Sequence, residues 1–261
     1  MFTFYNSNFV NSTSVNTVYG SATTGYLCDH NSKTKWEGVG AINTQTTLLT
    51  VSLASGTSSE INVMLINHNL QRFLVTAIGY PWITSTICSV ESYNGNNTQI
   101  QFPYISGIRY ILISSYSNTS SVTPYIGELI VSKGKIVELL APTANNFNES
   151  SRSIGIQRQM SDGGVISIRT SKKYSCNFTA TYVPSTTYSE LFGLWESNKD
   201  FIFAPFPNPI VCTTGSTYAS GKIWNGQADS VNWAGDFNAK YKDNNTVAGY
   251  TVPINLMEIP S

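Results

Sequence analysis

The sequence predicts an all-β protein with one short helix. Apolar runs rich in β-branched and aromatic residues recur about every 10–15 residues, bounded by Gly, Asn, Ser or Pro, with no helical periodicity between them. This spacing is typical of an antiparallel sandwich or barrel. The predicted strands are 47–53, 61–66, 72–78, 98–102, 109–115 and 126–132 in a first block, and 163–170, 174–183, 200–206, 230–241 and 249–259 in a second.

A change in composition separates the two blocks. The first ends at Ser132, and residues 133–150 then carry Gly134, Pro142 and an Asn-rich run. We therefore predict one domain over residues 1–133 and another over 134–261, each with its own core and able to fold alone.

One segment of the second block has helical spacing instead. Thr187 and Glu190 stand at the distance of a capping box, which predicts that the helix begins there. The apolar stripe of this helix should lie on a sheet as part of the core, and it consists of Tyr188, Leu191, Phe192 and Trp195.

The charge balance excludes several classes of partner. The formal net charge is +0 and only 11% of residues are charged, against about 25% in an ordinary domain. The sequence has no basic patch that would indicate nucleic-acid binding. It also has no signal peptide and no long apolar run that would indicate membrane insertion, so synthesis in a cytoplasm is expected. A neutral surface rich in Asn, Ser, Thr and Tyr fits either glycan recognition or a protein packed in an assembly.

Signatures of catalysis and of zinc binding are missing from the sequence. It has no nucleophile elbow, P-loop, zinc-protease or dinucleotide motif, and its acidic residues show no spacing that suggests two opposed carboxylates. We expect a non-enzymatic protein. The alternative in the enzyme class is a polysaccharide hydrolase. The scattered cysteines, Cys28, Cys88, Cys176 and Cys212, lack the close pairing of a zinc site and are expected to be free thiols.

The stretch LINHNLQRFLVT places three polar residues, Asn67, His68 and Asn69, inside an apolar run. The favoured interpretation is a polar turn whose side chains satisfy nearby backbone groups, because a buried donor left unpaired costs about 1–3 kcal/mol. The alternative is a ligand-binding role for His68 and Asn69.

The first block resembles the discoidin or galactose-binding-like jelly roll over about residues 2–132. An opening element of that family is matched by Leu27, Asp29, Asn31, Thr34 and Trp36, and its closing strand by Ile126, Glu128, Leu129 and Val131. Jelly-roll domains attached to phage structural proteins carry a similar "NHNL" segment. The resemblance implies an N-terminal jelly-roll β-sandwich.

The same resemblance implies two kinds of site. The family often holds a structural calcium, for which Asp29, Thr34 and Glu128 are the matching residues here, although Asp29 could instead cap a turn. A glycan site would use Trp36, His68 and Asn69. The aromatic residues available to stack on a sugar, which could equally fill the core, are Trp36, Tyr80, Trp82, Tyr93 and Tyr104.

The second block resembles the β-barrel domain of minor tail proteins from tailed bacteriophages, including distal-tail and baseplate-hub components. Its four ordered pieces are a Gly163-Gly164 hairpin, the strand pair Tyr174 and Phe178, the helix pattern Leu191, Leu194 and Trp195, and the run Phe201, Phe203 and Asn208. A long closing strand, Val252 to Ile259, also matches. This resemblance implies a C-terminal β-barrel.

Together, the resemblances imply a structural component of a phage virion, at the tail tip or baseplate. Its partners would be other tail or baseplate proteins and further copies of itself in a ring, with a glycan as an additional ligand of the jelly roll. The alternative is a host-glycan-binding lectin that is not part of a tail ring.

Overall fold

The computed structural model describes most of the chain. It leaves out residues 1, 7, 11–13, 19–23, 30–33, 39–43, 80–84, 92–95, 118–121, 140–146, 160–164, 214, 221–223, 225–227, 244–247 and 260–261. It describes the backbone alone for residues 54–58, 151–159, 165–173, 218, 220 and 243.

The described residues are mostly β and form two sheets, as the sequence predicts. The nine-stranded sheet has the order β14-β6-β5-β7-β4-β8-β3, with β2 on β4 and β13 on β7. Its strands are β2 (Val15–Thr17), β3 (Trp36–Glu37), β4 (Thr46–His68), β5 (Arg72–Gly79), β6 (Ser85–Glu91), β7 (Thr98–Ser117), β8 (Tyr125–Lys133), β13 (Ile210–Val211) and β14 (Ser216–Ser220). A short 3-10 helix, η1 (Thr24–Leu27), precedes β3.

Two very long strands fold the nine-stranded sheet into two layers. The first part of β4 pairs with the end of β7, and its last part pairs with the start of β7, with register shifts between residues 52 and 61. The first layer holds β2, β5, β6 and β14, and the second holds β3, β8 and β13. Apolar residues from both layers share one buried cluster, which includes Val51, Phe73, Trp36, Val63 and Leu129. The result is a β-sandwich-like fold, which we call the sandwich.

The second sheet is open. Its order is β10-β11-β17-β15-β12-β1-β9, with β16 on β17, so β10 and β9 lie at its two edges. The described strands do not close into the barrel that the resemblance implies. The strands are β1 (Phe2–Tyr5), β9 (Lys135–Leu139), β10 (Asn148–Gln159), β11 (Val165–Val183), β12 (Phe201–Pro205), β15 (Asp229–Trp233), β16 (Lys240–Asp243) and β17 (Ala248–Glu258).

The predicted helix is present, but its start differs from the prediction. Helix α1 (Ser185–Ser197) follows Pro184 and has no side-chain cap, so the capping box of Thr187 and Glu190 is wrong. Its stripe lies on the second sheet as expected: Leu191 is buried, and the Tyr188 ring stacks on Tyr250 of β17 at 4.0 Å. In the part of the chain that the structure describes, no helix has the length and apolar character needed to span a bilayer.

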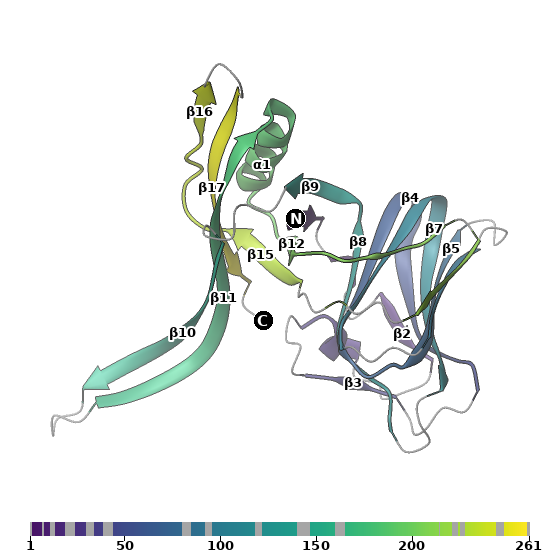
Figure 1. The fold of residues 1–261 in the computed structure, drawn as a ribbon. Helices are drawn as coiled ribbons and strands as arrows, with labels where there is room; N and C mark the ends of the chain where they lie inside the picture. Colours follow the sequence, from purple (N-terminus) through teal and green to yellow (C-terminus); the bar gives the residue numbers. More distant parts are fainter. Residues whose placement is uncertain are drawn as a thin grey trace.

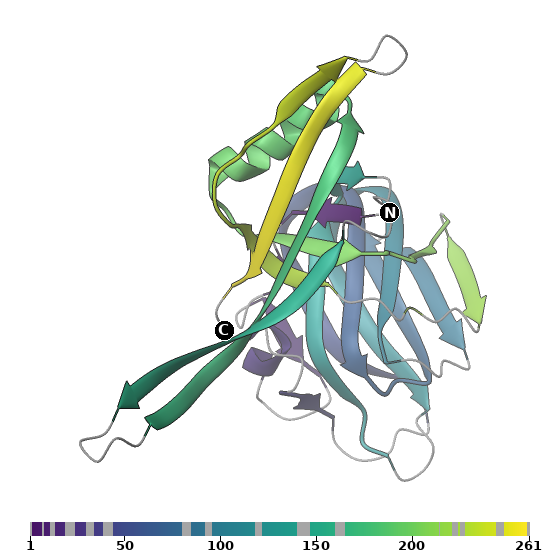
Figure 2. The ribbon, with the colours of Figure 1, turned by 60° about the vertical axis from the view of Figure 1, so that its left-hand side comes forward.

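The sandwich and the second sheet pack against each other through a third cluster, which we call the seam. Strand β1 alternates: Phe2 and Phe4 face the core under α1, whereas Tyr5 faces the sandwich. The second sheet is therefore buried on both faces at this strand. The seam consists of Tyr5, Met64, Ile66, Ile130, Ile202, Ala204, Trp224 and Ala228. Figures 1 and 2 show β1 and β12 lying beside the sandwich.

Strand pairing crosses the predicted boundary at residue 134 in both directions. The boundary does coincide with the turn between β8 and β9, where Gly134 has a φ of +41°. However, β1 comes before the boundary and pairs with β9 and β12 in the second sheet. Strands β13 and β14 come after it and pair with β7 and β6 in the sandwich. The spatial units are thus not the contiguous segments 1–133 and 134–261.

Candidate functional site

The segment Asn67-His68-Asn69 lies where β4 ends: Asn67 and His68 are the last two residues of the strand, Asn69 follows it, and His68 is fully buried. The backbone N–H of Leu70 donates to Nδ1 of His68 at 3.1 Å. Nδ1 is therefore unprotonated, and Nε2–H donates to the Thr98 hydroxyl at 2.8 Å. Both ring nitrogens of His68 thus have partners inside the protein. The His68 and Phe73 rings pack edge to face, with their centroids 5.4 Å apart.

The two asparagines that flank His68 fasten the same segment. Asn67 adopts a left-handed backbone, with φ of 50°, and its N–H donates to the Asn97 side chain at 2.8 Å. The Asn69 amide donates to the Thr123 carbonyl and accepts from the Tyr125 N–H, both at 2.7 Å. Asn69 thus bridges the segment to the chain that enters β8, and its amide is engaged with backbone on both sides.

Burial gives His68 a definite effect on the pH dependence of stability. It lowers the pKa of His68 from 6.5 to about 3, so the unfolded chain binds more protons than the folded chain between these values. The contribution of neutral His68 to the free energy of unfolding is therefore fully present above pH 6.5. As the pH falls from 6.5 towards 3, this contribution is lost by up to about 1.4 kcal/mol per pH unit. We expect the non-titrating variant His68→Gln to have a shallower fall.

The measurement is urea unfolding of both proteins at pH 7, 6, 5 and 4. His30→Gln, run in parallel, reports the share of the only other histidine. Equal slopes for wild type and His68→Gln would contradict the buried neutral imidazole.

Trp36 is a core residue rather than a sugar platform. Its side chain is 0% exposed and belongs to the sandwich cluster, and its Nε1–H donates to the Thr17 hydroxyl at 3.3 Å. With Trp36 and His68 both buried, the predicted glycan-binding trio has no aromatic face open to solvent. Of the other aromatic candidates, Tyr104 is 68% exposed, whereas Tyr80, Trp82 and Tyr93 lie outside the described residues.

The first loop brings together part of the predicted calcium set. The Thr34 hydroxyl donates to the Asp29 carboxylate at 2.6 Å. Burial raises the pKa of the half-buried Cys28 thiol, and the charges of Asp29 and of Glu128 on β8 raise it further. Among the described residues no group of three His, Cys, Asp or Glu could hold a metal, and residues 30–33 lie outside them. Calcium binding stays a prediction.

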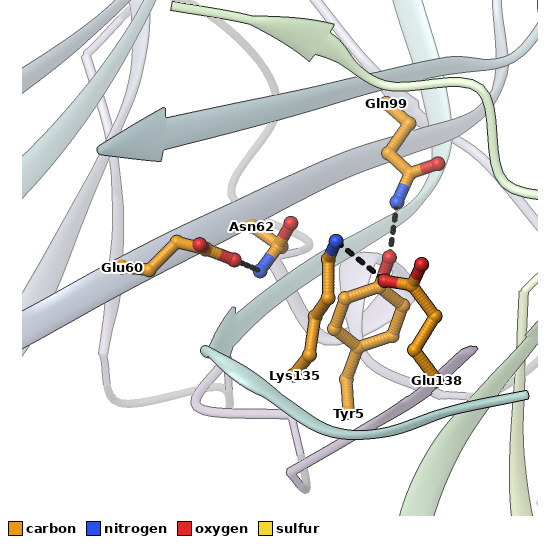
Figure 3. Close-up of polar contacts among 6 residues, drawn as sticks. All are labelled: Tyr5, Glu60, Asn62, Gln99, Lys135 and Glu138. Carbon is orange, nitrogen blue, oxygen red and sulfur yellow. Dashed lines mark hydrogen bonds and ion pairs between the residues drawn. The ribbon is translucent and has the colours of Figure 1, made fainter. Parts of the chain in front are cut away.

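A polar group interrupts the seam. The Tyr5 hydroxyl accepts a hydrogen bond from the Gln99 amide at 2.7 Å, and both residues are buried (Figure 3). Burial raises the pKa of Tyr5 to about 12. Nearby, the buried Asn62 amide donates to Glu60 at 3.3 Å, and Lys135 pairs with Glu138 at 2.8 Å. The Tyr5–Gln99 bond joins β1 to β7 of the sandwich, and no sequence motif marks it.

The most distinctive feature outside these sites is a two-stranded arm. Residues 151–159 and 165–174 form the part of β10 and β11 that pairs only within itself, because β17 joins β11 from Ser175 onward. The outer edge of β10 has no strand partner among the described residues. Both ribbon views show the arm projecting away from the rest of the protein (Figures 1 and 2).

Comparisons with known proteins give no family for this chain. No protein-family model matches it, and no curated protein matches it. The fold class, a mostly-β protein with a β-sandwich-like unit and a second open sheet, rests on the strand pairing alone.

Proposed function

We propose that the chain is a non-enzymatic structural subunit of a tailed-phage virion, located at the tail tip or baseplate and made in the host cytoplasm. Copies of the chain would associate with one another through the arm, and the assembly would also contain other tail proteins. The arm is the observation that carries this proposal, and the ordered matches to phage tail proteins in the second block support it.

The geometry of the arm favours contact with a partner molecule. An isolated two-stranded hairpin is marginal in water, because it has no hydrophobic face to bury against a third element. The unpaired edge of β10 also presents a row of backbone donors and acceptors that another chain can use. A long hairpin that projects from the protein is therefore stabilised when a neighbouring molecule covers it.

Charge favours a second copy as that neighbour. In the sequence of the arm, residues 151–174, five basic residues stand against the single acid Asp162, which gives a formal charge of +4. The whole chain has a net charge of +0, so the remainder carries −4. The arm of one copy and the body of another carry opposite charge, and so they attract each other. The basic residues are Arg152, Arg158, Arg169, Lys172 and Lys173.

The open second sheet fits a closed assembly. Its two edges, β10 and β9, lie at opposite ends of the strand order. Contacts between different surfaces of successive copies form a ring when the rotation between them closes. In this proposal the barrel of the resemblance is completed between subunits, and the sandwich is the discoidin-like jelly roll of the resemblance and lies outside the ring.

The lectin alternative receives less support. The aromatic and imidazole side chains that would recognise a sugar, Trp36 and His68, are both buried. Glycan binding therefore enters as an outcome of the test.

The arm can be removed without disturbing the sheet. Ser151 and Tyr174 are opposite each other in the β10–β11 pair, so an Asn-Gly turn can replace residues 152–173. The matched control shortens another hairpin: Asp243 and Ala248 are opposite each other in the β16–β17 pair, and Asn-Gly replaces residues 244–247.

We expect the arm-truncated protein to keep its melting temperature and to lose assembly. Tagged wild type, truncated protein and control would compete for incorporation into particles of the phage that encodes the chain. The truncated protein should be at least about tenfold depleted, which corresponds to about 1.4 kcal/mol, and the control should not. Mass spectrometry of purified particles measures the ratio.

Two outcomes would contradict different parts of the proposal. Equal incorporation of the truncated protein would remove the arm from assembly. Absence of the wild-type chain from purified virions, combined with binding to a glycan array, would favour the lectin.

A further inference from the structure

A segment of the second block crosses between the two layers of the sandwich. Strand β13 pairs with Ile100 and Gln101 of β7 in one layer, and the Cys212 N–H donates to the Gln101 carbonyl at 2.8 Å. Strand β14 then pairs with β6 in the other layer, where Thr217 lies opposite Cys88. Cys212 therefore lies at the crossing point.

The crossing brings two thiols together. The Thr213 N–H donates to the Thr217 hydroxyl at 2.9 Å, so the chain next to Cys212 folds back to the position opposite Cys88. The Cys212 thiol donates to the Ile210 carbonyl at 3.9 Å, and the neighbouring Cys88 thiol raises the pKa of Cys212. Both cysteines are buried in the same apolar cluster. Cys176 belongs to the other core, and Cys28 packs at the margin of the sandwich cluster.

We propose that Cys88 and Cys212 form an intramolecular disulfide when the protein meets an oxidising disulfide such as oxidised glutathione. One cysteine thiolate attacks a glutathione sulfur and releases one reduced glutathione. The other thiolate attacks the protein-bound sulfur and releases the second. The two thiols lose two protons and two electrons, and the glutathione disulfide takes them up.

The bond would join the two layers of the sandwich and hold the segment that the second block contributes. The reaction is slow in the folded protein, because the neighbouring Cys88 thiol and burial raise the pKa of Cys212 and little thiolate is present. Strand β14 has only five residues and lies at the edge of its sheet. Its local opening exposes both sulfurs together and sets the rate.

The test incubates the full chain in a glutathione redox buffer, both as folded protein over days and during refolding from the reduced, denatured state. We expect two of the four thiols to be lost and a Cys88–Cys212 peptide to appear on non-reducing digestion. The melting temperature should rise by about 5–10 °C over the reduced protein. Cys212→Ala should abolish this rise, and the matched variant Cys176→Ala should keep it.

A second readout does not depend on thermal stability. After one cut between β9 and β12, oxidised wild-type fragments should stay joined on a non-reducing gel, and Cys212→Ala fragments should separate. Four free thiols after refolding, or a bridge that uses Cys28, would overturn the proposal.

Discussion

A chain that begins at Asn6, and so lacks β1, is expected to lose the cooperative unfolding of its second sheet. Phe2 and Phe4 are fully buried and pack on Phe178, Phe201 and Phe203, and Tyr5 fills the seam. Removing one buried aromatic side chain costs about 3–5 kcal/mol. Three such losses reach the whole stability of an ordinary domain, about 5–15 kcal/mol. The fragment 134–261 should fail to fold for the same reason.

Urea unfolding followed by tryptophan fluorescence and by far-ultraviolet circular dichroism provides the measurement. A peptide of residues 1–8 should restore the transition when added to the shortened chain, and a scrambled peptide of the same composition should not. An unchanged midpoint in the shortened chain would show that β1 is dispensable and would favour the contiguous division at residue 134.

Trp36→Ala is expected to destabilise the protein by about 3–5 kcal/mol, because it empties a large volume in the sandwich cluster and leaves Thr17 without its partner. Trp36→Phe should cost less, since the ring remains. The matched control is Tyr104→Ala, which removes an aromatic side chain that is 68% exposed and should change stability by no more than about 0.5 kcal/mol.

Chemical denaturation gives the three values. If Trp36→Ala unfolds at the same urea concentration as wild type, Trp36 does not belong to the core, and its role in recognising a ligand would have to be reconsidered.

The sequence predicts features that depend on local patterns. The mostly-β class, the helix near Tyr188 and the polar segment at His68 follow from spacing and side-chain chemistry over a few residues. Predicted pairs of strands proved to be single strands, as in β4 and β7, because a bend between two layers looks like a turn in sequence. The capping box failed because Pro184 already starts the helix.

Other features depend on contacts between distant segments and have no local signal. Four residues, Phe2–Tyr5, are too few for a strand to be recognised, although they lie between β12 and the edge strand β9 of the open sheet. The match of Trp36 to a family motif does not distinguish a core residue from a binding residue, since an aromatic side chain suits both. The meeting of Cys88 and Cys212 likewise depends on a crossing that only the tertiary structure contains.

The pairing of strands across residue 134 also determines the order in which the sheets can form during synthesis on the ribosome. Strand β1 is synthesised first, but its partner β12 follows nearly two hundred residues later, which is about 10–40 s of translation at bacterial rates. Phe2, Phe4 and Tyr5 lack both neighbouring strands until β9 has been made, and they lack β12 until the end of that interval. The sandwich likewise waits for β13 and β14. Such long-range pairing slows folding, so incomplete chains expose apolar edges, and slowed translation between β9 and β12 should increase aggregation of the nascent protein.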